Sequence, residues 1–128
     1  MTASLVAAVM AVALLVLRHP APATVETRSS GAQVGFASPE RLREHFEKHG
    51  AEFGAANSAE YLAHAQALRD AALGGPVLEA VRADGVVSRF DRASGTFVAF
   101  DRDGIIRTCF KPNDGERYFV RQAKRRSR

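Results

Sequence analysis

The sequence predicts an α+β domain in which two N-terminal helices pack on an antiparallel meander sheet of four or five strands, preceded by a hydrophobic leader helix. Apolar residues recur at helical spacing between residues 38 and 73. From residue 77 onward, short runs of β-branched and aromatic residues alternate with glycine-containing turn sequences. These turns are too short for the crossovers that parallel strands require, and a chain of 128 residues allows only one such domain.

The hydrophobic leader comprises residues 3–17, which contain no charged residue. This run is shorter than the ~20 apolar residues that usually span a bilayer, and it resembles the hydrophobic region of a signal peptide. Ala21-Pro22-Ala23 then matches an A-x-A cleavage site, whereas Arg18 directly after the apolar run favours an uncleaved anchor. Either alternative predicts a secreted or membrane-anchored protein, with membrane association through the leader.

The composition divides the chain into three parts. Residues 1–31 comprise the signal or anchor segment and a linker rich in Pro, Ser and Thr, residues 32–122 form the domain, and residues 123–128 form a basic tail. The last twelve residues hold six of the 18 Lys and Arg residues and none of the 14 Asp and Glu residues. The preceding residues therefore contain 12 cations and 14 acids, and their net charge is −2. The tail is predicted to be either a solvated extension or an arm that contacts RNA or anionic lipid.

The first helix is predicted to run from Pro39 to about His49. Ser38 can cap its first turn, and proline suits the first helical position because no hydrogen-bonding N–H is needed there. Gly50 then ends the helix.

The second helix is predicted to follow a cap at Asn57 and to run to about Leu73. Glu60 lies three residues after Asn57, which is the spacing of a capping box. The sequence Gly74-Gly75-Pro76 ends the helix.

Five strands are predicted after this point. Turn sequences such as Asp84-Gly85 and Asp103-Gly104 separate the first four strands, as in β-hairpins. The predicted strands comprise residues 77–82, 86–91, 96–100, 105–110 and 118–121.

The histidines offer the first candidate site. His45 and His49 lie four residues apart and therefore project from one side of the first helix. Their sequence is H-F-E-K-H rather than the zinc-binding H-E-x-x-H, and neither a third ligand nor a second cysteine beside Cys109 is evident, so no metal or other cofactor is expected. An imidazole with a pKa of about 6.5 can instead act as an acid or a base at neutral pH, and the alternative is that both rings pack at the edge of the core.

The later strands add groups that could hold a phosphate. Thr108, Lys111 and Tyr118 supply a hydroxyl, an ammonium and a phenol near one edge of the sheet. Strand alternation places Arg107 on the face opposite Thr108, and Arg89 is a further candidate in the second strand. The alternative for each side chain is an ordinary exposed position on a sheet.

Three sequence blocks resemble a known family. The segment 45–54 (HFEKHGAEFG) is similar to the H-F-x-K-H-G-x-E-F-G helix of bacterial polymorphic toxin nucleases, and segments 104–112 (GIIRTCFKP) and 118–122 (YFVRQ) are similar to its later blocks. The family has the barnase–EndoU–colicin–RelE-like fold and includes the C-terminal tRNase domains of contact-dependent inhibition toxins. The resemblance covers roughly residues 38–122.

The resemblance implies a metal-independent endoribonuclease that acts on RNA, often tRNA, and a cognate immunity protein. On this basis, His49 is expected to be the acid or base, and His45 is the second choice. Thr108, Lys111 and Tyr118 match positions that would bind the phosphate or stabilise the transition state. The sequence therefore predicts a toxin-type RNA endonuclease, and the alternative is an exported or membrane-anchored binding module without catalysis.

Overall fold

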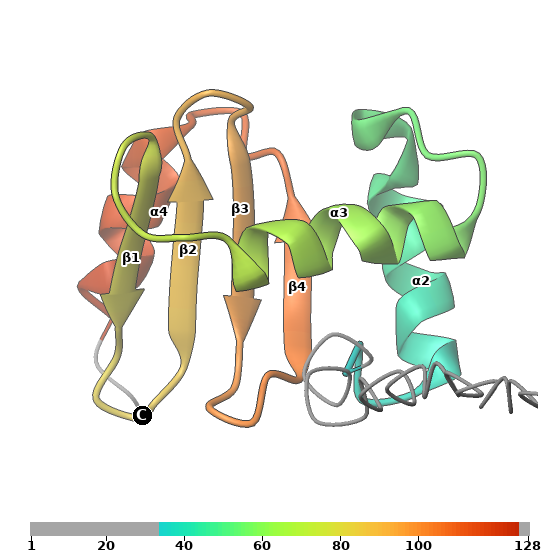
Figure 1. The fold of residues 1–128 in the computed structure, drawn as a ribbon, viewed down its shortest axis with the longest axis horizontal. Coiled ribbons are helices and arrows are strands. Elements are labelled where there is room, and N and C mark those ends of the chain that lie inside the picture. Colours follow the sequence, from blue (N-terminus) through green and yellow to red (C-terminus); the bar gives the residue numbers. More distant parts are fainter. Residues whose placement is uncertain (1–33, 126–128) are drawn as a thin grey trace, which may run out of the picture.

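The computed structural model describes residues 34–125, which form an α+β domain of three α-helices and one four-stranded sheet (Figure 1). The predicted leader helix and residues 3–17 lie outside the described residues. Within residues 34–125, no helix has both the length and the hydropathy needed to cross a membrane. The elements are α2 (Pro39–His49), the 3₁₀ helix η1 (Gly50–Phe53), α3 (Ser58–Asp70), β1 (Val77–Val81), β2 (Val87–Asp91), β3 (Thr96–Phe100), β4 (Ile106–Phe110) and α4 (Glu116–Ala123).

Local capping sequences fix where the first two helices begin, as predicted. The Ser38 hydroxyl accepts a hydrogen bond from the Arg41 N–H at 3.2 Å, which caps α2. At α3, the Asn57 side chain accepts from the Glu60 N–H at 2.9 Å, and the Glu60 carboxylate accepts from the Ala56 N–H at 2.8 Å. The capping box predicted from the sequence is therefore formed, with the carboxylate bonded one residue before the cap.

Helix α3 ends at Asp70, three residues before its predicted end. Ala71 is already extended, with ψ at 147°. The guanidinium of Arg89 in β2 donates to the carbonyl oxygens of Leu68 and Ala71 at 3.3 and 2.6 Å. A contact from a distant strand thus satisfies carbonyl groups at this helix end, which local sequence signals cannot reveal.

The sheet is the predicted antiparallel meander, with strand order β1-β2-β3-β4. The predicted fifth strand is wrong, because residues 118–121 lie in helix α4. Gly115 precedes the helix with a positive φ of 56°, and Phe119 on its inner side is only 7% exposed. The burial of Phe119 against Phe90 favours a helix even though the sequence Y-F-V-R is typical of a strand.

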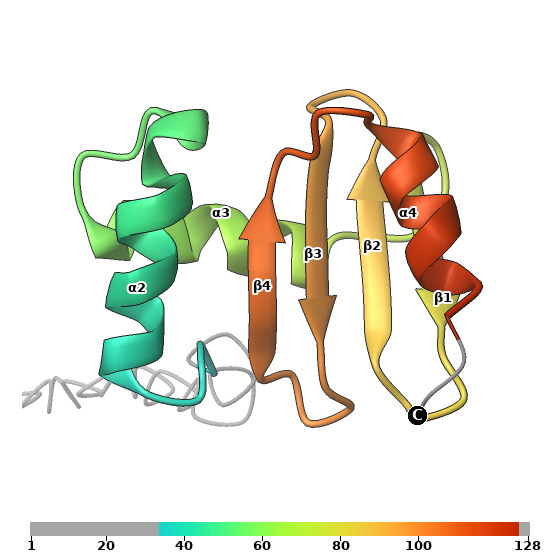
Figure 2. The same cartoon turned by 180° about the vertical axis from the view of Figure 1, so that it is seen from behind.

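Helices cover both faces of the sheet (Figures 1 and 2). Helix α3 crosses one face and α4 packs on the opposite face, while α2 lies beside the outer edge of β4. Two separate groups of buried residues result. Tyr61, Ala65, Leu68, Val98, Phe100, Ile106 and Cys109 form the core under α3, whereas Phe90, Phe97 and Phe119 form the core under α4.

Tyr61 connects α3 to β4 through the larger core. Its side chain is fully buried, and its hydroxyl donates to the Cys109 carbonyl oxygen at 2.5 Å. Burial raises the pKa of the Tyr61 phenol well above its usual range, which keeps the donor protonated. Burial likewise raises the pKa of the Cys109 thiol to about 12, so Cys109 is a neutral core residue.

Tyr61→Phe is expected to lower the free energy of unfolding by about 1–3 kcal/mol, because the Cys109 carbonyl loses a donor in a dry core. Tyr118→Phe is the matched control. The Tyr118 hydroxyl makes no hydrogen bond within residues 34–125, so this loss should stay below about 0.5 kcal/mol. Urea unfolding followed by circular dichroism measures both changes, and equal losses would contradict the assigned role of the Tyr61 hydroxyl.

Candidate active site

The candidate active site begins with a hydrogen-bonded pair at the end of α2. His49 is the last residue of α2, and η1 turns the chain so that Glu52 lies beside it. The His49 Nδ1 and Glu52 Oε2 atoms are 2.5 Å apart. Because a carboxylate only accepts hydrogen bonds, this pairing assigns a proton to Nδ1, so that in the neutral form of the ring the lone pair lies on Nε2. This orientation is the one that a base acting through Nε2 requires.

Gly50 makes the local turn between these two residues possible. It is buried, and a Cβ at this position would lie 2.5 Å from Cδ2 of Phe46. Its N–H also donates to the Phe46 carbonyl oxygen at the end of α2. Any larger residue would have to displace the Phe46 ring, so glycine at position 50 allows η1 to follow α2 without a gap.

Glu52 also joins this helix end to the sheet. Its Oε1 atom accepts a hydrogen bond at 2.8 Å from the backbone N–H of Lys111, which directly follows β4. The His49 ring stacks on Phe110 with 5.2 Å between ring centroids, and its side chain is 15% exposed. His49 is thus fixed by contacts with Glu52 and Phe110 while its ring still reaches solvent.

Tyr118 contacts the same phenyl ring from α4. Its ring packs edge-on against Phe110, with 5.0 Å between the centroids, and lies 4.9 Å from the ring of Phe97. Burial is the main cause that raises the pKa of the Tyr118 phenol above its usual value. The phenol therefore keeps its proton at neutral pH and can donate a hydrogen bond. His49 and Tyr118 thus both contact the Phe110 ring.

A polar cleft of about 270 Å³ lies between α4 and the sheet, beside Tyr118. In Figure 2, β3 and β4 face the viewer between α2 and α4. Three predicted site residues, Arg107, Thr108 and Tyr118, line the cleft, and two further cations, Arg82 and Arg125, extend its basic character. The remaining lining residues are Val86, Ser88, Phe97, Ala99 and Gln122.

A β-bulge corrects the prediction that Arg107 and Thr108 face opposite sides. Thr108 pairs with Ala99, but the next pair in the register is Ile106 with Phe100, so one extra residue lies in β4. A bulge of this kind interrupts strict alternation. Arg107 and Thr108 consequently line the same cleft, whereas Ile106 belongs to the core on the other face.

The structure separates Lys111 from these cleft residues. Its Nζ atom lies over the ring of Phe53, 5.4 Å from the ring centroid, and lines a different cleft under α3. Only the Lys111 backbone takes part in the His49–Glu52 arrangement. The predicted group of Thr108, Lys111 and Tyr118 is thus divided between the two faces of the sheet.

Arg89 is held within the fold. Besides its two bonds to carbonyl oxygens at the end of α3, its Nε donates to the Glu79 carboxylate at 2.7 Å. It lines neither of the two clefts just described. These contacts make Arg89 a structural link between β1, β2 and α3 rather than a member of the candidate active site.

His45 supports the site through packing. Its ring stacks on Phe36 with 4.8 Å between centroids and lies 6.3 Å from the His49 ring. Its Nδ1 atom is buried, with no hydrogen-bond partner in the described part of the chain. Burial first, and the nearby His49 and Arg41 second, lower the pKa of His45 from its ordinary value of 6.5. The ring is therefore neutral at neutral pH.

Sequence reasoning missed Glu52, Arg82 and Arg125. Glu52 follows His49 by three residues, a spacing that can place a carboxylate beside an imidazole, but the signal depends on the turn at η1. The two arginines come from the end of β1 and the end of α4, which only the fold brings to one cleft. Within residues 34–125, no cluster of three or more His, Cys, Asp or Glu side chains is arranged to hold a metal ion.

A scan against models of protein families finds no match to the chain, and a search of curated proteins finds no significant relative.

The lowered pKa of His45 predicts a specific loss of stability in acid. His45 binds a proton more readily in the unfolded chain than in the folded one. The stability gained from its neutral, buried ring is therefore complete above about pH 6.5, and it is lost as the pH falls through the lower pKa that His45 has in the folded state. His45→Phe keeps a ring against Phe36 but cannot be protonated. Between about pH 8 and about pH 5, its free energy of unfolding should fall less than that of the wild type. Equal decreases in urea titrations would contradict this assignment.

Proposed function

We propose that the domain is a metal-independent RNA endonuclease of bacterial toxin type, with tRNA as its expected substrate and an immunity protein as its expected partner. The main support is the His49–Glu52 pair, whose oriented imidazole lies beside Phe110 at the edge of β4. The Arg107–Thr108–Tyr118 cleft on the adjoining face of the sheet adds cations and hydrogen-bond donors. Cleavage of RNA through its own 2′-hydroxyl requires both a base and groups that bind the phosphate.

In the proposed reaction, Nε2 of His49 takes the proton of a ribose 2′-hydroxyl. The 2′-oxygen forms a bond to the adjacent phosphorus, and the bond from phosphorus to the 5′-oxygen of the next nucleotide breaks. Tyr118, which is protonated at neutral pH, donates its proton to the departing 5′-oxygen and regains one from solvent, and His49 releases to solvent the proton that it took. The products are a 2′,3′-cyclic phosphate and a 5′-hydroxyl end.

Arg107 and Thr108 would stabilise the negative charge that develops on the phosphate oxygens. Arg107 already carries an ion pair to Asp101 at 2.6 Å, but its side chain is 54% exposed and can exchange this partner for a phosphate. Arg82 and Arg125 extend the positive surface of the cleft for neighbouring phosphates. RNA binding should consequently weaken as the salt concentration rises.

His49→Ala is expected to reduce the cleavage of tRNA in EDTA by at least about 100-fold, because it removes the proposed base. Arg43→Ala is the matched control, since Arg43 is an exposed residue of the same helix. Gel analysis of purified tRNA measures the rate. Intact RNA with the wild-type protein would overturn the nuclease proposal and would favour the alternative of a non-catalytic binding module.

Glu52→Gln should slow cleavage by about 10-fold or more while the fold is retained. The glutamine amide can still accept from the Lys111 N–H, but its NH₂ group would donate to Nδ1 of His49 and favour the tautomer that protonates Nε2. Nitrogen NMR of the imidazole reports the tautomer independently of activity. A wild-type rate combined with a changed tautomer would contradict the role of Nε2 as the base.

A further inference from the structure

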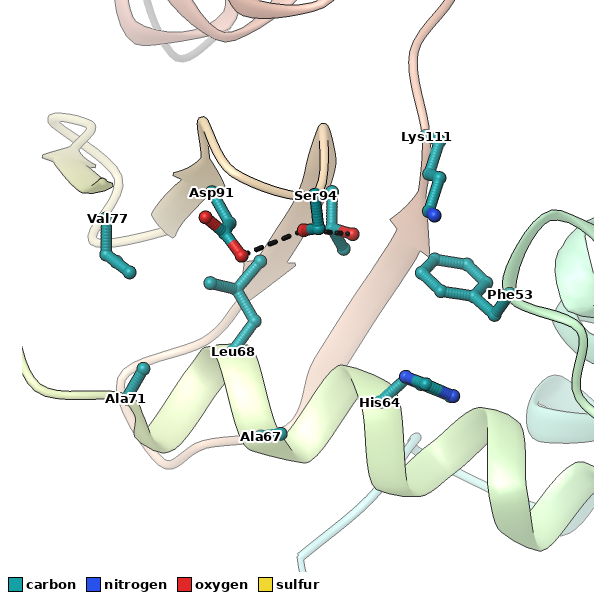
Figure 3. Close-up of a pocket in the computed structure, with 10 residues that line it drawn as sticks. Phe53, His64, Ala67, Leu68, Ala71, Val77, Asp91, Ser94 and Lys111 are labelled. Atoms are coloured by element: carbon teal, nitrogen blue, oxygen red, sulfur yellow. Dashed lines mark hydrogen bonds between the residues drawn. The ribbon is translucent and has the colours of Figure 1, made fainter.

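A second cleft, of about 340 Å³, lies on the α3 face of the sheet and is not used by the proposed reaction (Figure 3). This volume is within the range of small-molecule sites. The cleft is bounded by α3 and by the ends of β2, β3 and β4 on that face. Its lining residues are Phe53, His64, Ala67, Leu68, Ala71, Val77, Asp91, Ser94, Thr96 and Lys111.

One end of this second cleft is suited to an anion. The Lys111 ammonium lies over one part of the Phe53 ring, and the His64 ring lies 5.4 Å from the Phe53 centroid. Neither Lys111 nor His64 has an ion-pair partner within the part of the chain that the structure describes. Figure 3 shows both side chains directed toward the space beside Phe53.

The other end is suited to a hydrogen-bond donor. Asp91 accepts from the Ala93 N–H at Oδ1 and from the Ser94 hydroxyl at Oδ2, both at 2.8 Å. The hydroxyl oxygens of Ser94 and Thr96 are 2.9 Å apart. Each carboxylate oxygen keeps a free lone pair, and Asp91 has no cationic partner within residues 34–125. An amino group arriving here would find an acceptor already held in place.

The floor of the second cleft between these two ends is apolar. Ala67 on α3 and Ala71 directly after it are small and leave space above the helix, while Leu68 and Val77 supply apolar surface. Phe53 adds an aromatic ring at one side. The complementary ligand therefore has a largely apolar or flat body, an anionic group at one end and an amino group at the other.

The second cleft and the candidate active site use neighbouring residues of the chain. Phe53 follows Glu52, and Lys111 follows Phe110, so the residues that hold the His49 ring are the chain neighbours of residues at the anionic end. A nucleic-acid strand bound at His49 and continuing around the end of β4 would reach Lys111 next. This proximity distinguishes a nucleotide from other ligands with the same polarity.

We propose that the second cleft is a nucleotide-binding subsite that receives the nucleotide flanking the scissile phosphate, with its phosphate at Lys111 and the exocyclic amino group of adenine, cytosine or guanine at Asp91. This inference rests on the proposed nuclease function. It adds a base preference, because uracil has no exocyclic amino group to donate to the carboxylate.

The test is titration of the full chain with the 3′-monophosphates of adenosine, cytidine and uridine, which cannot be cleaved by the proposed reaction. NMR signals of His64 and Ser94 should move on binding, and uridine 3′-monophosphate should bind most weakly. Lys111→Ala should weaken binding of all three about tenfold or more, because it removes a hydrogen bond to a charged group. Arg43→Ala, which changes an exposed cation outside the cleft, should bind as the wild type does.

Asp91→Asn separates the two ends of the cleft. Asparagine can still accept from the Ala93 N–H, so the turn should form, but the negative acceptor is lost. The preference for cytidine over uridine should shrink while Lys111-dependent binding persists. Absence of nucleotide binding, or equal binding by the wild type and Lys111→Ala, would overturn the subsite alone. Loss of the nuclease function would appear separately, as intact tRNA in the cleavage assay.

Discussion

The bridge formed by the Glu52 carboxylate is the interaction on which the rest of the candidate site depends. One oxygen accepts at Nδ1 of His49 and the other accepts from the Lys111 N–H, so a single side chain joins the end of α2 to the end of β4. Glu52 and Lys111 lie 59 residues apart in the chain. Without the bridge, the imidazole would be positioned only by its stacking on Phe110. Stacking fixes the separation of the two rings but does not decide which ring nitrogen carries the proton.

Strand β4, one of the two edge strands of the sheet, presents side chains to both of its faces. Its bulge sends Arg107 and Thr108 into the cleft beside α4, while Ile106 and Cys109 fill the core under α3. At its end, Lys111 lines the cleft on the α3 face. Residues of β4 and of its end thus contribute to both clefts.

The sequence was most informative where structure is decided locally. Caps such as Ser38 and Asn57 and the glycine-containing turns predicted the helix starts and the meander, because their hydrogen bonds form within a few residues. It was least informative where distant packing decides. Helix α4 was predicted as a strand, since the burial of Phe119 on the sheet outweighs local preference. Strand alternation likewise does not predict the bulge at Arg107. Glu52 is recognised as the partner of His49 only once the turn at η1 is known.

The arginines of the domain differ in how easily each could exchange its present hydrogen-bond or ion-pair partner for a ligand. This difference distinguishes arginines that could bind a phosphate from arginines that hold the fold together. Arg69 is only 5% exposed, and Arg89 is held by two carbonyl oxygens and a carboxylate, so moving either would leave buried polar groups unsatisfied. Arg107 instead pairs with Asp101 at an exposed position, where an ion pair contributes little net free energy. A phosphate can therefore replace Asp101 at small cost. The proposed contact between Arg107 and a phosphate would therefore break no contact that the core requires.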